Sequence, residues 1–295
     1  MIPGFIILII FFIMAAAMMT KRLPTFLALP IMAVLIGTVS AVSNCMPLNA
    51  KEGNSLTNFI FQTILTEGSV KLAQAMMYTL FGAVLSQVVL KTGIAEKIIK
   101  ISAELAGDKK LIIAFFLFLA TAVVFTSLTG LGSVIMIGTL ALPILIGCGF
   151  TPLYAGSVLL FGICLGGIFN AAGWGFFTQV LNIELSVVKD FAVGYGVILT
   201  IVAVIFIITE NFRDGSRFAW SIDLNEEIKK DVPVPALLTP LIPVLLITIP
   251  ALKWPIIPAF IFAIIYGAVT TNIKNTIPTL TSSIIDGLKD MAPVI

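Results

Sequence analysis

The stretch TSLTGLGS at 126–133 lies in the middle of an apolar region, 111–147, that is too long for a single membrane span. A helix crosses the hydrocarbon core with about 20 residues. Small polar residues and glycines at the centre of such a region predict two short helices that meet at a tip, which is a re-entrant hairpin. Backbone that is not helical at membrane depth must be buried in protein or line a cavity. Two full spans joined by an external loop are the alternative.

A second interruption, GGIFNAAGWG at 166–175, follows within the apolar region 153–183. Glycines on both sides of an asparagine predict a discontinuous helix with free backbone N–H and C=O groups. Paired interruptions of this kind indicate a transporter binding site. The N-termini of half-helices can hold a carboxylate, and carbonyl, Ser, Thr and Asn oxygens suit a sodium ion.

Simpler interpretations exist for several of these residues. Gly162 and Gly166 have the spacing of close helix packing. Trp174 is also interpretable as an anchor at the membrane interface. Three polar residues of 70–90 are expected to join helices rather than bind a ligand: Gln74, Tyr78 and Gln87.

Composition places the chain in lipid. Of its 295 residues, 59% are hydrophobic and 11% are charged, and the mean hydropathy is +1.13, whereas soluble domains carry about 25% charged residues. A net charge of +2 gives no indication of a nucleic-acid partner. The chain has no histidine, and its three cysteines lack metal-ligand spacing. Zinc sites and Ser-His or Cys-His catalysis are therefore excluded, and we expect no enzyme and no cofactor other than a bound sodium ion.

Hydropathy predicts membrane spans separated by three polar or amphipathic segments. The linker 44–69 is expected to contain a short interfacial helix, and 92–110 has the pattern of an amphipathic helix on the membrane surface. The segment 210–233 is rich in charge and ends at Pro233. Besides the two interrupted regions, the predicted spans are 3–20, 23–43, 70–90, 191–209, 235–252 and 254–271.

The distribution of basic residues predicts an N-terminus outside and a multi-pass protein of the cell inner membrane. Only Lys51, Lys71, Lys189 and Lys253 then lie outside. The cytoplasmic set is much larger: Lys21, Arg22, Lys91, Lys97, Lys100, Lys109, Lys110, Arg213, Arg217, Lys229, Lys230, Lys274 and Lys289.

Residues 235–252 run in the opposite direction to residues 3–20, as inverted repeats require. The segment EGSVKLAQAMMYTLFG at 67–82 has a counterpart in IIDGLKDMAPVI at 284–295. We expect a truncated second repeat, or a partner polypeptide that supplies the rest. No Asp, Glu, Lys or Arg lies deep in any predicted span, so sodium is favoured over a proton as the coupling ion.

These segments resemble the ion transporter superfamily, which includes citrate, gluconate and C4-dicarboxylate permeases. The resemblance covers residues 65–184, in particular 70–106, FTSLTGLGSVIMIGTLALPILIGCG at 125–149 and GGIFNAAGWGFFTQVLNIE at 166–184. It implies that the tip and the break together hold a carboxylate and, in many members, sodium. The implied substrate- and ion-binding residues are Ser127, Thr129, Gly130, Gly132, Ser133, Asn170, Ala171 and Gly173, with sodium at Ser127, Gly132 and Asn170. The tip departs from the Ser-Asn-Thr of the sodium–dicarboxylate branch.

The expected fold is an all-α integral membrane protein, a polytopic helical bundle with a re-entrant hairpin and a broken helix, forming the first part of an inverted-repeat transporter. Its first repeat, 1–209, would be followed by a cytoplasmic linker, 210–233, and a truncated second repeat, 234–295. Within the first repeat we expect a scaffold at 1–66, an arm helix at 67–110, the hairpin at 111–149, the broken helix at 150–185 and a closing helix at 190–209.

The expected function is secondary transport of small organic anions such as citrate, gluconate or other carboxylates, coupled to sodium. A sodium/proton antiporter is one alternative, and a non-transporting membrane subunit that needs a partner half is another. The resemblance implies a homodimer as well.

Overall fold

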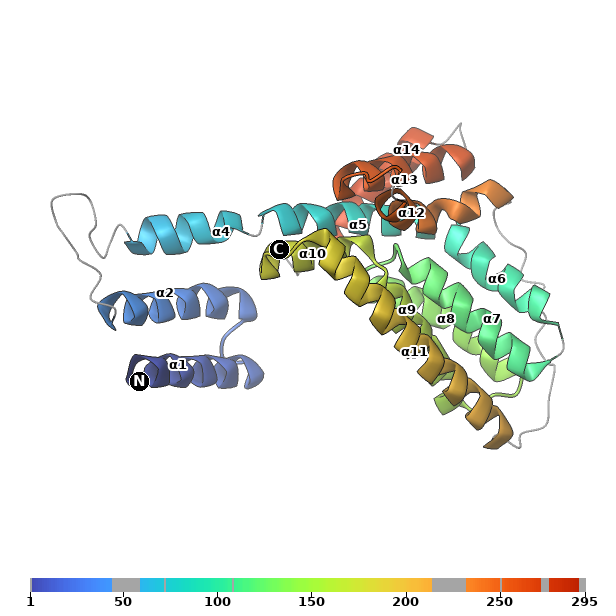
Figure 1. Cartoon of the computed structure of the whole chain (residues 1–295), viewed down its shortest axis with the longest axis horizontal. Coiled ribbons are helices and arrows are strands. Elements are labelled where there is room, and N and C mark those ends of the chain that lie inside the picture. Colours follow the sequence, from blue (N-terminus) through green and yellow to red (C-terminus); the bar gives the residue numbers. More distant parts are fainter. Residues whose placement is uncertain are drawn as a thin grey trace. The chain divides into compact units, whose positions relative to one another are not determined.

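The computed structural model describes residues 2–43, 59–71, 73–107, 109–213, 232–249, 251–271 and 276–291. All regular secondary structure in these ranges is helical, which confirms the expected all-α class. The chain divides into two compact units, residues 1–73 and 74–295, whose helices are labelled in Figure 1.

The first unit contains two apolar helices that pack against each other. The start of the first helix and the end of the second line one shallow groove, from Pro3 to Ser43, so the two helices run antiparallel. A π-helical segment packs on the second helix at Gly37, where an added Cβ would lie 2.2 Å from Ile64 Cδ1. The predicted helix in 44–69 thus begins at Phe59, while 44–58 lie outside the described residues. The elements are α1 (Ile2–Met19), α2 (Thr25–Ser43), η1 (Phe59–Glu67) and α4 (Gly68–Lys71).

The second unit begins at the second residue of α5 (Ala73–Lys91), which is followed by α6 (Ile94–Ala106). Gly93 joins them with φ +81°, a left-handed conformation that favours glycine. Apolar side chains of α6, including Ile94 and Ile99, are fully buried, and the helix packs on the next one along the chain. The predicted amphipathic helix is therefore present, but protein covers its apolar face.

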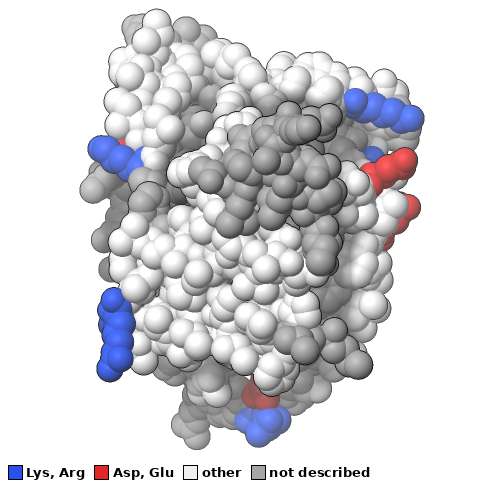
Figure 2. Space-filling model, turned by 90° about the vertical axis from the view of Figure 1, so that its left-hand side faces the viewer, with Lys and Arg blue, Asp and Glu red and all other residues white. Residues whose placement is uncertain are grey.

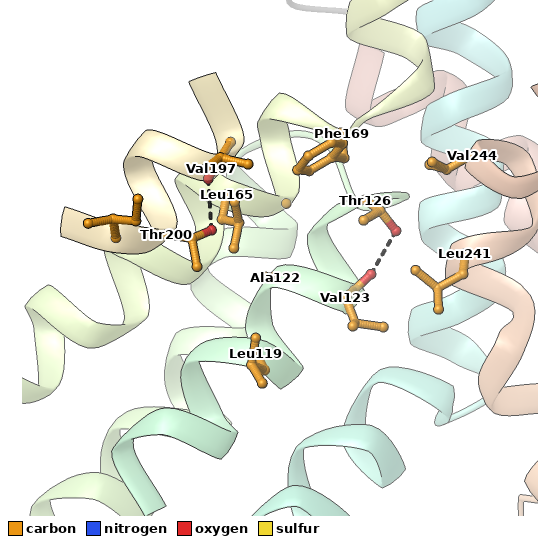
Figure 3. A pocket seen from close by; sticks show the side chains of 13 residues that line it. Leu119, Ala122, Val123, Thr126, Leu165, Phe169, Val197, Thr200, Leu241 and Val244 are labelled. Carbon is orange, nitrogen blue, oxygen red and sulfur yellow. Dashed lines mark hydrogen bonds between the residues drawn. The ribbon is translucent and has the colours of Figure 1, made fainter. Parts of the chain in front are cut away.

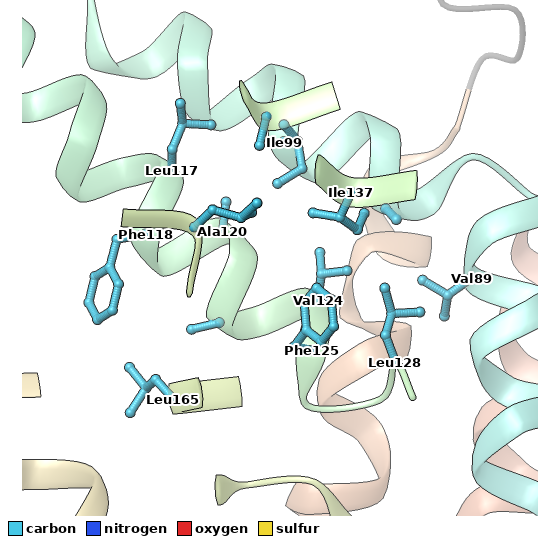
Figure 4. Packing of buried hydrophobic residues seen from close by; sticks show 14 of the residues in the cluster. Val89, Ile99, Leu117, Phe118, Ala120, Val124, Phe125, Leu128, Ile137 and Leu165 are labelled. Atoms are coloured by element: carbon cyan, nitrogen blue, oxygen red, sulfur yellow. The ribbon is translucent and has the colours of Figure 1, made fainter. Parts of the chain in front are cut away.

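The predicted hairpin is formed by α7 (Lys110–Phe125) and α8 (Leu131–Gly147). Lys110 Nζ donates to the Gly149 carbonyl over 2.8 Å and lies 4.7 Å from the centre of the Phe150 ring. The start of α7 and the end of α8 therefore lie together, and the tip is at the other end. A helix that is apolar on all sides is typical of a core, and Figure 4 shows Leu117, Phe118 and Val124 of α7 within the main hydrophobic cluster.

The predicted broken helix consists of α9 (Pro152–Ile168) and α10 (Ala171–Leu181), which meet at 57°. Gly162 and Gly166 face α7, because a Cβ at Gly166 would lie 2.4 Å from the Ala122 carbonyl oxygen. The packing interpretation of this glycine pair is thus confirmed. The closing helix, α11 (Leu185–Arg213), is longer than expected at both ends, so 210–213 belong to it and not to a linker.

The C-terminal segment packs against α5. A Cβ at Gly287 would lie 3.0 Å from the Val84 backbone. Lys91 forms an ion pair with Asp286, and the Gln87 side chain donates to Asp290, as expected of a residue that joins helices. The segments before and after the predicted linker therefore pack together, although 214–231 lie outside the described residues. The elements are η2 (Val234–Leu241), α12 (Ile242–Thr248), α13 (Ile256–Thr271) and α14 (Thr276–Met291).

By length and composition, α5 and α11 are each able to cross a membrane, and α9 with α10 qualifies as one bent span. The other apolar helices of the described ranges, including α7 and α8, are shorter. Large apolar side chains lie exposed along α11, for example Phe191, Ile198 and Ile205. Figure 2 shows one face of the molecule, on which most of the described surface carries no charge.

Candidate functional site

The tip of the hairpin spans residues 126–130 between α7 and α8. The Thr126 hydroxyl lies 2.7 Å from the Val123 carbonyl and 2.8 Å from the Pro240 carbonyl, which fixes the tip against η2. Ser127 is fully buried, and its hydroxyl lies 3.4 Å from the Val124 carbonyl. Ser127 therefore faces the inside of the tip and not its open side.

The open side of the tip is the N-terminus of α8. Gly130 takes φ +84° and ψ 161°, a backbone conformation that essentially only glycine adopts. In the described part of the chain, no side chain caps this helix, and a Cβ added at Gly130 or Gly132 would meet nothing within 4 Å. Both glycines are exposed. The first N–H groups of a helix have no partner within the helix, and the dipole makes this end positive. The tip thus exposes the positive N-terminal end of α8.

Behind this end, α8 contacts α5 through hydroxyl groups. The hydroxyls of Ser86 and Ser133 lie 2.8 Å apart, and Ser133 also donates to the Thr129 carbonyl over 2.8 Å. The Thr129 hydroxyl oxygen is inaccessible to solvent and has no hydrogen-bond partner among the residues that the structure describes. A buried hydroxyl without a hydrogen-bond partner lowers the free energy of unfolding by about 1–3 kcal/mol.

Asn170 joins the helix break to the tip. Its side-chain NH₂ donates to the carbonyls of Phe125 and Leu128 over 3.3 and 3.2 Å, and its Oδ1 accepts from the N–H groups of Ala172 and Gly173 over 3.0 and 3.4 Å. Asn170 is therefore at once the N-cap of α10 and a clamp on the end of α7. With all these groups in use, the predicted role of Asn170 as a direct sodium ligand requires the clamp to open.

Trp174 provides the hydrogen-bond donor for the last carbonyl of α9, on the other side of the break. Its indole N–H donates to the Ile168 carbonyl over 2.7 Å, and the side chain is 3% exposed. The ring is therefore buried at the break, and the alternative interpretation as an anchor at the membrane interface is wrong. A side chain from the first turn of α10 thus donates a hydrogen bond across the break to the last carbonyl of α9.

The arm helix α5 passes the point where tip and break meet. A Cβ added at Gly82 would lie 3.0 Å from Ala172 Cβ and 3.8 Å from Thr129 Cγ2. Glycine is needed here because α10 and the tip approach the α5 backbone closely. One turn earlier, Tyr78 fills the space above Gly175, where an added Cβ would lie 2.3 Å from the ring.

The structure thus brings together most of the residues predicted for the site. Thr129, Gly130, Gly132 and Ser133 lie on the open side or against α5, while Ala171 is fully buried and Gly173 half-buried. Neither 126–133 nor 166–175 contains a charged residue. In the described part of the chain, no group of His, Cys, Asp or Glu side chains is placed to hold a metal ion.

Sequence reasoning missed Ser86, Gly82 and Thr126. Gly82 and Ser86 are small residues one helical turn apart on an apolar helix, a pattern that indicates close approach by another element. Thr126 gave no such signal, because its partner Pro240 lies 114 residues further along the chain.

An apolar groove of about 440 Å³ lies next to the tip, between α7, α9, α11 and the η2–α12 segment. Figure 3 shows Thr126 and Phe169 at the same end of it, with Thr200 of α11 hydrogen-bonded within its own helix. Its lining is otherwise almost entirely aliphatic and aromatic, so it lacks the groups that a small organic anion needs.

Comparison with protein-family models, with curated proteins and with solved structures found no match to this chain.

Replacing Trp174 by Phe should loosen the break while keeping its apolar packing. The substitution removes the indole N–H and leaves the partly buried Ile168 carbonyl without this donor. We expect a loss of about 1–2 kcal/mol in the free energy of unfolding, measured by thermal unfolding of the purified chain. Trp254→Phe is the matched control, and an equal loss in both variants would contradict a special role for the Trp174 N–H.

Proposed function

We propose that this chain is a polytopic inner-membrane protein that acts as a secondary transporter of small organic anions such as citrate or gluconate, with coupling to a cation. The observation that carries the proposal is the uncapped, accessible N-terminus of α8 at a hairpin tip that Asn170 clamps to a helix break. The expected orientation has the N-terminus outside.

Three features support an anionic substrate. The N-terminus of α8 combines free N–H groups with the positive end of a helix dipole, which favours a carboxylate. No acidic side chain in 126–133 or 166–175 would repel it. The absence of basic side chains there leaves recognition to the backbone, so binding is weak enough to be reversible, as transport requires.

The bent α9–α10 pair and the long α11 support a membrane environment. Irregular backbone at membrane depth is tolerated where protein surrounds it, and the tip and the break are covered by α5 and η2. Movement of the hairpin against α5 would carry the substrate across. A homodimer of this chain remains part of the proposal.

The test is uptake of radiolabelled citrate or gluconate by the full chain in proteoliposomes, with and without a sodium gradient. Leu131 is the first residue of α8 and 74% exposed. Proline is tolerated at a first helical position but has no N–H. Leu131→Pro should therefore fold normally and raise the half-saturating substrate concentration about tenfold, the cost of one hydrogen bond to a charged group.

Leu131→Ala keeps the backbone N–H and is the matched control, with uptake equal to that of the original chain. No uptake of either anion would reject the function and favour a packing subunit. Exchange of sodium for protons without anion uptake would favour the antiporter. Equal uptake by Leu131→Pro and Leu131→Ala would reject the α8 N-terminus as the binding end.

A further inference from the structure

We propose that the apolar groove beside the hairpin tip binds one acyl chain of a bilayer phospholipid. The groove lies between α7, α9, α11 and the η2–α12 segment and has a volume of about 440 Å³. This inference goes beyond anion transport and does not depend on it, because it needs only a membrane around α11.

The walls of the groove offer nothing to a polar ligand. None of the described residues that line it is charged, and the hydroxyl groups of Thr126 and Thr200 are already hydrogen-bonded. Thr126 Oγ1 lies 2.7 and 2.8 Å from the Val123 and Pro240 carbonyls, and Thr200 Oγ1 donates to the Gly196 carbonyl over 2.7 Å. A trapped water needs about two to four polar partners. The chemistry of the lining therefore favours a hydrocarbon.

Small residues on three helices leave the space for this ligand. Gly166 of α9 and Gly196 of α11 have no side chain, and Ala122 of α7 has only a methyl group. Figure 3 shows Ala122 between Thr200 on one side and Leu241 on the other. Protein interiors are close-packed, and an empty space of this size forfeits dispersion contacts. A hydrocarbon chain that fills the groove gains these contacts.

The groove lies near the middle of α11 and opens along its exposed face. Its α11 residues extend from Gly196 to Ile201, and no charged residue occurs between Asp190 and Glu210. At 1.5 Å per residue, these charges are about 9 and 14 Å from the two ends of that stretch. With α11 crossing the bilayer, the groove is therefore at the depth of acyl chains and not of headgroups. Val197 and Ile201 are more than half exposed, so a chain can enter from the lipid.

The volume fits one acyl chain better than it fits a helix of a second copy of this protein. A cavity of about 150 Å³ with aliphatic and aromatic walls holds one benzene ring, so a space about three times as large accepts roughly 18 carbon atoms. This is the size of a common phospholipid chain. A helix is about 10 Å across with a pitch of 5.4 Å, so a single turn would fill the groove.

A chain in the groove would contact both parts of the proposed transport site without entering it. Thr126 and Phe169 lie at the same end of the groove in Figure 3. Thr126 holds the tip against η2 through the Pro240 carbonyl, and the Phe169 ring packs edge-on against Trp174 of the break, with ring centroids 6.5 Å apart. The lipid would therefore support the tip and the break in the arrangement described above.

The experiment is photo-crosslinking of the full chain in vesicles of phosphatidylethanolamine and phosphatidylglycerol. The probe is a phosphatidylcholine with a diazirine group on one acyl chain, and labelled residues are located by peptide mass spectrometry. We expect labels on α7 at Ala122 and Val123 as well as on exposed residues of α11. Lipid that only surrounds the protein would label Ile198 of α11, which is exposed, but not Ala122, which is buried.

Thr200→Phe places a ring in the groove, and Thr209→Phe is its matched control. Thr209 is an exposed residue of the same helix outside the groove, and the hydroxyl of each threonine is bonded within α11. Because a phenyl ring takes about a third of the groove, Thr200→Phe should lower the labelling of α7 about tenfold. Thr209→Phe should leave it unchanged. Val244→Phe fills the groove from the opposite wall and should repeat the loss, so the result does not depend on the folding of one variant.

Three outcomes would overturn the proposal. Labels confined to exposed residues of α11, or labels on α7 that neither Thr200→Phe nor Val244→Phe lowers, would show that no chain occupies the groove. Labelling of α7 by a photoreactive free fatty acid, without labelling by the phospholipid, would reject a bilayer lipid as the source. A dimer in mild detergent that Thr200→Phe dissociates and Thr209→Phe preserves would assign the groove to a second copy.

These outcomes are distinct from those of the uptake experiment. Loss of the lipid site would leave anion transport as proposed, since the α8 N-terminus lies outside the groove. Absence of anion uptake, with labels on α7 that the two groove variants lower, would reject the transport function and leave the lipid site.

Discussion

Gly166→Ala should destabilise the protein by about 2–3 kcal/mol although it adds a single methyl group. The new Cβ would lie 2.4 Å from the Ala122 carbonyl oxygen and 2.5 Å from Phe125 Cβ. Because one of these atoms is backbone, the strain is relieved only if α9 moves away from α7, and overpacking of this kind is costly. Thermal unfolding of the purified chain would measure the loss.

The neighbouring Gly167 is the matched control. It lies in the same helix, is exposed, and has nothing within 4 Å of an added Cβ. Alanine is preferred to glycine inside a helix by about 0.5–1 kcal/mol, so Gly167→Ala should stabilise the protein slightly. Changes of the same sign in both variants would contradict the packing of α9 on α7.

Asn170→Ala should cost about 2–4 kcal/mol of stability and abolish transport. The substitution removes the cap of α10, worth about 1 kcal/mol, and leaves the Phe125 and Leu128 carbonyls without their donor. The tip and the break would then be free to separate. Thermal unfolding and anion uptake in proteoliposomes would measure the two effects.

The Asn170→Ser variant tests the N-cap of α10 separately from the hydrogen bonds that Asn170 donates to the Phe125 and Leu128 carbonyls. Serine is a good N-cap, but its shorter side chain cannot also donate to both tip carbonyls. We therefore expect this variant to recover the capping part of the stability without recovering uptake. Full recovery of uptake by Asn170→Ser would show that the contact between Asn170 and the tip is dispensable.

The helices and their two interruptions could be predicted well from sequence, because they depend on local properties. Apolar length sets the helices, and the glycines near 130 and 166–175 set the interruptions. The break itself lies at Phe169 and Asn170, and Asn170 is an N-cap by residue type. The closing helix was predicted too short, because Glu210 and Arg213 suggested a linker, whereas they form an ion pair one turn apart on α11.

The sequence predicted which residues belong to the site, but not how their side chains are arranged in space. Ser127, Thr129 and Ser133 are similar polar residues of one short segment. Yet Ser127 is buried in the tip, Ser133 contacts α5, and the Thr129 hydroxyl has no hydrogen-bond partner within the described ranges. Their directions depend on the conformation of Gly130 and on what packs behind it. Trp174 was open to two interpretations for the same reason, since only its surroundings show that it caps a carbonyl.

The sequence by itself determined that this chain forms apolar helices with two adjacent uncharged interruptions, since composition, apolar length and glycine placement are local. Only the tertiary structure decided that the interruptions meet, that Asn170 clamps them, and that Ser86 lies beside Ser133. The partners of Asn170 are 42 and 45 residues away, and the two serines are 47 residues apart. Such contacts follow from the packing of α5, α7 and α10, which no local pattern encodes.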